Sequence, residues 1–184
     1  MYEQRKECYL REISRLTDLS TSSVSRHLDK FKSNDIVNER KSGRELMYKL
    51  NLNNPLCRKL LEIIEIRKTQ DFKKRFPKLS LIFEDIVEML KKKSINITVF
   101  GSIAKETFSE KSDIDILLIS ETKQEFVEAI KNINIEYNKD LSIIDFTRSE
   151  FEKKKTEPIV GQIIKNHLVL HGYEYFVKEM IYYE

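Results

Sequence analysis

The segment FGSIAKETFSEKSDIDILLI, residues 100–119, contains the pattern that decides the fold of the C-terminal part of the chain. An apolar run ends at Gly101-Ser102, and a polar stretch leads to a second apolar run that begins with Asp113-Ile114-Asp115. Short apolar runs bounded by turn residues predict strands, and the Gly-Ser pair predicts a turn into a helix. The segment therefore predicts a strand, a turn with a short helix, and a second strand.

The predicted turn is suited to binding phosphate groups. The free N–H groups and the dipole at the start of a helix attract anions, and glycine lets the backbone approach a triphosphate closely. The Ser102 hydroxyl can donate to a phosphate oxygen. We therefore expect the nucleotide-binding residues to be Gly101, Ser102, Lys105 and Ser112.

Asp113 and Asp115 lie two residues apart on the second predicted strand, so both carboxylates point to the same face. Adjacent carboxylates repel each other unless a cation lies between them. Mg²⁺ is the expected ion, because it prefers hard oxygen ligands and is commonly shared with substrate phosphates. The two residues are therefore candidate metal ligands and catalytic residues.

This stretch resembles the minimal nucleotidyltransferases of the polymerase-β-like superfamily, whose signature is Gly-Ser, a spacer and Asp-x-Asp. The resemblance implies a mixed sheet flanked by helices. It also implies transfer of a nucleoside monophosphate from an NTP to a hydroxyl group, with Mg²⁺ and release of pyrophosphate. A base near Asp140 would then take the proton of the acceptor.

The sequence departs from this family at two positions. Glu106 stands where the family often has glycine, which places an anion near the predicted phosphate turn. The third carboxylate of the family comes from a later strand, where this chain has Ser142. Asp140 would lie on the same strand face and could substitute, whereas Asp145 would lie on the opposite face unless the strand bulges.

The N-terminal residues predict a helix-turn-helix followed by a wing. Apolar residues recur at helical spacing over residues 10–18 and 21–34, and Ser20 or Thr21 can cap the second helix. Residues 36–50 read as two strands around Gly43, which permits the positive φ of a hairpin turn. We expect the second helix to bury Val24, Leu28 and Phe31.

This region resembles the winged helices of small prokaryotic and archaeal repressors of the ArsR or MarR type, which implies double-stranded DNA as a partner. Residues 1–50 contain eleven Lys/Arg and eight Asp/Glu, which accounts for the whole net charge of +3. Basic and hydroxyl side chains on the second helix and the wing suit base edges and phosphates. The candidate DNA contacts are Thr21, Ser22, Ser23, Ser25, Arg26, Lys30, Arg40, Lys41 and Arg44. The alternative is that the winged helix serves as a protein-interaction module.

The predicted organisation is two-domain and α/β (α+β). We expect a winged helix over residues 1–52, a connecting helix over 53–77 and a nucleotidyltransferase-like domain over 78–184. The apolar side of the connecting helix should include Leu56, Leu60, Ile63, Ile64 and Phe72. It must pack against the neighbouring domain or against the same helix of a second subunit, and we favour the homodimer contact. Further helices are predicted near residues 79–92, 124–133, 149–155, 158–170 and 173–183, and a strand over 141–146.

The composition indicates a soluble cytoplasmic protein. Cys8 and Cys57 lie far apart, without the spacing of a zinc site or a disulfide framework. No apolar run approaches the roughly 20 residues of a membrane helix.

Three functions fit these features. The first is a transcriptional regulator whose second domain senses or transfers nucleotides, and the second is a nucleotidyltransferase that its winged helix directs to a target. The third, implied by the resemblance alone, is a toxin-antitoxin component that pairs with a helical toxin-type protein.

Overall fold

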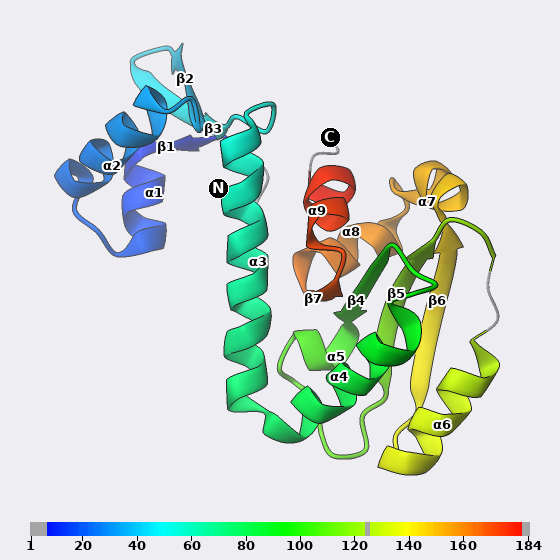
Figure 1. Cartoon of the computed structure of the whole chain (residues 1–184). Coiled ribbons are helices and arrows are strands. Elements are labelled where there is room, and N and C mark those ends of the chain that lie inside the picture. Colours follow the sequence, from blue (N-terminus) through cyan, green and yellow to red (C-terminus); the bar gives the residue numbers. More distant parts are fainter. Residues whose placement is uncertain (1–6, 124–125, 182–184) are drawn as a thin grey trace. The chain divides into compact units, whose positions relative to one another are not determined.

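The computed structural model describes residues 7–123 and 126–181, which divide into two compact units (Figure 1). The first unit is Met1–Leu61 and the second is Glu62–Glu184. The division falls within helix α3 (Pro55–Arg75), so each unit contains part of this helix. Neither α3, at 21 residues, nor any other helix in the described part of the chain combines the length and apolarity needed to cross a membrane.

The first unit confirms the predicted helix-turn-helix and wing. Its elements are β1 (Cys8–Tyr9), α1 (Leu10–Thr17), α2 (Thr21–Ser33), β2 (Val37–Ser42) and β3 (Glu45–Leu50). The strands form an antiparallel sheet in the order β1-β3-β2. Ser42 pairs with Glu45 across the tip of the wing, and Gly43 between them has φ of +62°.

Helix α2 begins at a serine cap. The Ser20 hydroxyl accepts a hydrogen bond from the Ser23 N–H at 3.2 Å, so Ser20 is the cap and Thr21 is the first helical residue. Val24 and Leu28 are buried as predicted, but the prediction for Phe31 was wrong, because its side chain is 42% exposed. Phe31 lies in the last turn of α2, where the residues that follow it up to Asp35 are exposed or partly buried, so the buried side of the helix ends at Leu28.

The second unit is built around a four-stranded mixed sheet, which confirms the predicted fold class. Its elements after α3 are α4 (Pro77–Leu90), β4 (Asn96–Phe100), α5 (Gly101–Ala104), β5 (Ile114–Ser120), α6 (Val127–Tyr137), β6 (Leu141–Thr147), α7 (Arg148–Lys154), α8 (Pro158–Lys165), β7 (Leu168–His171), α9 (Tyr173–Tyr175) and the π-helix Phe176–Ile181. The strand order is β6-β5-β4-β7. Strands β5 and β6 are parallel, and the other pairs are antiparallel.

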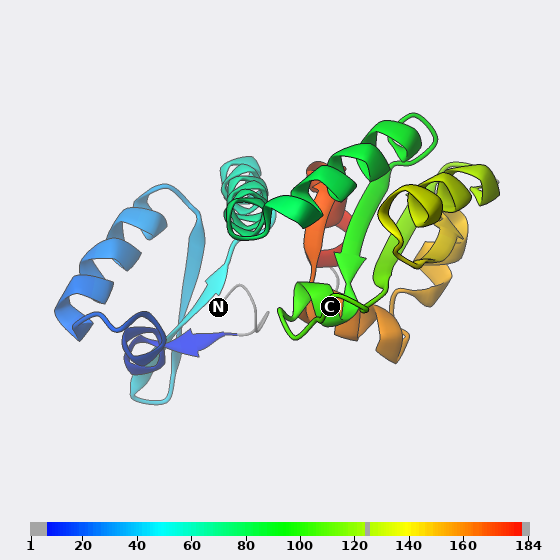
Figure 2. The same ribbon diagram turned by 90° about the horizontal axis from the view of Figure 1, so that it is seen from below.

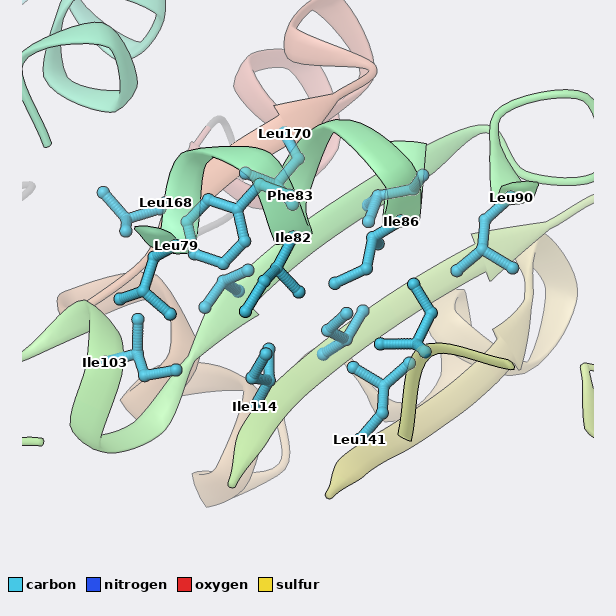
Figure 3. Packing of buried hydrophobic residues seen from close by; sticks show 14 of the residues in the cluster. Leu79, Ile82, Phe83, Ile86, Leu90, Ile103, Ile114, Leu141, Leu168 and Leu170 are labelled. Atoms are coloured by element: carbon cyan, nitrogen blue, oxygen red, sulfur yellow. The ribbon is translucent and has the colours of Figure 1, made fainter. Parts of the chain in front are cut away.

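Helices cover both faces of this sheet. Figure 2 shows α4 and α6 on one face and α8 on the other. The apolar face of α4 packs on alternate residues of β5, namely Ile114, Ile116 and Leu118, in one buried cluster (Figure 3). Because strand side chains alternate between faces, Asp115 lies on the face away from α4.

Two predicted helices differ from the structure. The helix predicted over residues 158–170 ends at Lys165, and Leu168–His171 forms β7, which pairs with β4 at an edge of the sheet. A short apolar run fits a strand or a helix equally well, and the neighbouring strand decides between them. The helix predicted from residue 124 begins at Val127; residues 124 and 182–184 lie outside the described part.

Helix α3 also packs through side chains that the sequence did not single out. Phe72 is buried, but Ile63 and Ile64 are 58% and 47% exposed, while Glu65 and Thr69 are buried instead. Thr69 donates a hydrogen bond to the Val169 carbonyl at 2.9 Å, and Glu65 Oε2 lies 2.9 Å from His167 Nε2. His167 Nδ1 lies 2.8 Å from the Ile164 carbonyl, which only accepts, so the ring donates to it through Nδ1 and turns Nε2 toward the Glu65 carboxylate.

Candidate functional site

The turn between β4 and α5 requires glycine for two reasons. Gly101 has φ of +69°, a left-handed conformation that side chains disfavour. A Cβ atom on Gly101 would also lie 2.1 Å from Asp115 Oδ2. Residue 100 pairs with Asp115 across β4 and β5, so the turn starts directly beside this carboxylate. The predicted turn and the Asp-x-Asp strand are thus in contact.

Asp113 and Asp115 lie where β5 begins. Asp113 is exposed just before the strand, and Asp115 is partly buried in it. Burial, and secondly the charge of Asp113, raise the pKa of Asp115 above its ordinary value. A hard divalent cation fits this pair, because the donors are carboxylate oxygens and a positive charge relieves their repulsion.

The raised pKa of Asp115 makes stability depend on pH. A raised folded-state pKa means that the folded protein holds this proton more tightly than the unfolded chain, so ionisation destabilises the fold. Without divalent cations, we expect Asp115→Asn to raise the melting temperature at pH 7, and the gain to disappear as the pH falls through the raised pKa to below 3.8, the ordinary value. Thermal unfolding between pH 3 and 8 measures this. A loss of stability that is the same at every pH would contradict it.

The loop before Asp113 is tied to the segment between α6 and β6. Lys139 donates to the carbonyl oxygens of Glu110 and Ser112, and the Ser112 hydroxyl accepts from the Ser109 N–H at 2.8 Å. Ser102 is partly buried at the start of α5, and Lys105 is exposed at its end. The sequence analysis identified Ser112 but missed Lys139, because nothing in the sequence indicates which carbonyl groups a distant lysine reaches.

The position expected for a third carboxylate holds Ser142. Strand register places Ser142 directly opposite Asp115 on the parallel pair β5 and β6. Asp140 lies just before β6, and its carbonyl accepts from the Ile114 N–H at 2.8 Å, so it lies beside the start of β5. Asp145 pairs with Leu118 in the register of β5 and β6, so it lies on the sheet face that α4 covers. Lys123 Nζ lies 3.3 Å from Asp145 Oδ2. Within the described residues, no three His, Cys, Asp or Glu side chains gather as a metal site.

Glu106 is not a free anion beside the turn. Its carboxylate accepts two hydrogen bonds from the Arg75 guanidinium, at 2.5 and 2.6 Å. This hydrogen bonding with Arg75 lowers the pKa of Glu106, so the residue is ionised and paired at neutral pH. The sequence analysis missed Arg75, which stands in an ordinary basic run 31 residues before its partner.

The candidate DNA contacts lie on α2 and the wing. Thr21, Ser22, Arg26 and Lys30 are exposed on α2, whereas Ser23 and Ser25 are partly buried. Lys41 and Arg44 are exposed at the tip of the wing. Arg40 forms a bidentate pair with Glu7, which occupies its guanidinium within the domain.

Fold and site together define a nucleotidyltransferase-type domain joined to a winged helix. The nucleotidyltransferase domain family matches residues 79–175, and the bacterial regulatory protein family arsR matches residues 3–39. The chain belongs to the nucleotidyltransferase domain family. A solved structure described as "Crystal structure of the toxin-antitoxin with AMP-PNP" is 20% identical over 54% of this chain and 84% of its own, with a TM-score of 0.41. No curated protein matches the chain significantly.

Proposed function

We propose that the protein is a DNA-binding transcriptional regulator whose nucleotidyltransferase domain binds a nucleoside triphosphate with Mg²⁺. The observation that carries the nucleotide part is the contact between the Gly101 turn and Asp115, with Asp113 directly before the same strand. This contact brings the Gly101 turn and the two carboxylates to one place, and recognition of a metal-bound triphosphate requires phosphate-binding groups and cation ligands close together.

Each residue of the site has a distinct role in this proposal. Asp113 and Asp115 hold Mg²⁺, whose charge offsets that of the triphosphate. The amide groups at the Gly101 turn and the Ser102 hydroxyl bind phosphate oxygens, because the first amides of a helix have no partner within it. Lys105 and Ser112 contribute further polar contacts from the end of α5 and from the loop before β5.

The winged helix provides the DNA-binding part. Helix α2 presents small hydroxyl residues at its first turn, Arg26 after them and Lys30 in its last turn, a combination that fits the major groove. Lys41 and Arg44 at the wing tip contact the adjacent backbone or minor groove. Because Arg40 is paired with Glu7, we expect it to contribute less to DNA binding than the sequence alone suggested.

A homodimer completes this proposal. Two copies of α2 are needed to read a palindromic operator, and α3 offers exposed Leu56, Ile63 and Ile64 as an apolar contact. Sedimentation equilibrium tests this directly: a protein that stays monomeric at all concentrations and on its duplex would contradict the dimer.

Selection of duplexes from a random pool tests DNA recognition. We expect enrichment of a specific sequence, whose affinity falls steeply with rising salt because bound phosphates release counterions. If the protein enriches no sequence, or if its binding does not depend on salt, the regulator proposal fails.

A second candidate is an active nucleotidyltransferase that modifies a protein or RNA. The position of Asp140 at the start of the parallel strands favours it, since its backbone carbonyl accepts from the N–H of Ile114, the residue between Asp113 and Asp115. In this case the acceptor oxygen would attack the α-phosphorus, pyrophosphate would leave with the electrons of the broken bond, and Asp140 would take the acceptor's proton.

Ser142 separates the two candidates. If the absence of a carboxylate at residue 142 limits transfer, Ser142→Asp should increase Mg²⁺-dependent release of pyrophosphate from NTP by about tenfold. This increase is smaller than the roughly 100-fold that a well-positioned base provides, because no neighbouring residue has been placed to orient the new carboxylate. Ser142→Asn is the matched uncharged control. A wild-type protein that turns over as fast as Ser142→Asp would instead favour an active enzyme that uses Asp140.

A further inference from the structure

Glu106 follows the phosphate turn in a backbone conformation that side chains disfavour. Its φ is +57°, a left-handed value in which the Cβ atom crowds the following carbonyl oxygen. Its carboxylate would also repel a triphosphate bound nearby. A glutamate at this position is therefore unfavourable on both counts, unless its side chain forms a compensating interaction.

Arg75 supplies that interaction. The planar Arg75 guanidinium donates two hydrogen bonds to the planar Glu106 carboxylate, at 2.5 and 2.6 Å, which forms a bidentate pair. Arg75 is itself fixed at the end of α3, where its guanidinium lies 5.5 Å from the centre of the Phe76 ring. The Phe76 ring also lies 5.1 Å from that of Phe108, two residues after Glu106. The end of α3 and the segment after the turn thus share an aromatic contact as well as the ion pair.

The backbone connects Glu106 to the turn itself. The N–H groups of residues 105, 106 and 107 donate to the carbonyl oxygens of Gly101, Ile103 and Ser102, at 3.2, 3.0 and 3.0 Å. Residues 101–107 therefore form one hydrogen-bonded unit, and fixing Glu106 fixes the first turn of α5.

We propose that Arg75 is a positioning residue for nucleotide binding, which acts only through Glu106. The ion pair holds the left-handed residue that closes the turn and neutralises an anion that would otherwise repel the triphosphate. The inference rests on the proposed function, because it assigns this role at the same nucleotide site. It predicts that Arg75 is needed only while residue 106 is glutamate.

Replacements at both positions test this prediction. Arg75→Ala should weaken binding of Mg²⁺-ATP about tenfold, since it leaves one uncompensated charge near the phosphates. Glu106→Gly should bind normally, because glycine adopts the same φ without a charge. The double variant Arg75→Ala/Glu106→Gly should recover wild-type affinity. Arg67→Ala, another exposed arginine of α3, is the matched control and should change nothing.

Adenosine and ATP distinguish charge repulsion from general damage to the site. The loss in Arg75→Ala should be large for ATP and small for adenosine, which has no phosphate. If Arg75→Ala/Glu106→Gly stays as weak as Arg75→Ala while its melting temperature is normal, Arg75 contacts the nucleotide itself and the inference is wrong. If wild-type protein binds no Mg²⁺-ATP, the proposed function fails first, and this role fails with it.

Discussion

Mg²⁺ and ATP together should raise the melting temperature of the wild-type protein and leave that of Asp113→Asn/Asp115→Asn unchanged. A ligand that binds only the folded state adds about 2.7 kcal/mol of stability at 100 times its Kd. Asparagine preserves the size of both side chains but removes the charges that we propose hold the cation. Because loss of groups that merely support metal ligands costs about 10–100-fold, we expect loss of both ligands to cost about 100-fold or more.

The matched control is Glu88→Gln, which removes an exposed carboxylate from α4. Its melting temperature should respond to Mg²⁺ and ATP as the wild type does. If Mg²⁺ and ATP stabilise the double variant as much as the wild type, the nucleotide binds elsewhere. If ATP stabilises the wild type without any divalent cation, the two aspartates are not needed as cation ligands.

Removing the exposed basic side chains of α2 and the wing should abolish specific DNA binding. The variant replaces Arg26, Lys30, Lys41 and Arg44 by alanine. A base-contacting arginine contributes about 1–3 kcal/mol, and each lost phosphate contact lowers the salt slope by about 0.9. We therefore expect affinity for the selected duplex to fall by about 1000-fold, with a much weaker dependence on salt.

A second variant controls for the loss of charge alone. Lys91, Lys92, Lys93 and Lys111 are exposed lysines of the second unit, and replacing them by alanine removes the same four charges. Fluorescence anisotropy across a salt series compares the two variants. Equal losses in both would mean that net charge rather than the winged helix governs binding.

The sequence was sufficient to predict the features that depend on local pattern. The Gly101 turn, the alternating strand after Asp113 and the wing around Gly43 all follow from residues close in the chain, because turn geometry and strand periodicity are local. The mixed sheet followed from the resemblance that these residues carry. Ser142 was also predicted to occupy the position of the third carboxylate, and strand register places it opposite Asp115.

The features that escaped prediction depend on distant partners. Strand β7 was predicted as helix because its three apolar residues, Leu168 to Leu170, become a strand only by pairing with β4. Glu65 was not expected in the packed face of α3, because its partner His167 lies about 100 residues away. Arg75 and Glu106 are a third example: neither residue alone indicates that the two form an ion pair.

Equilibrium dialysis of the wild-type protein against each of the four NTPs, with and without Mg²⁺, tests the central claim most directly. The account predicts that at least one NTP binds with Mg²⁺ present and is released when the ion is chelated. If a protein that still binds its selected duplex retains no NTP under either condition, the nucleotide site is degenerate and the account is contradicted.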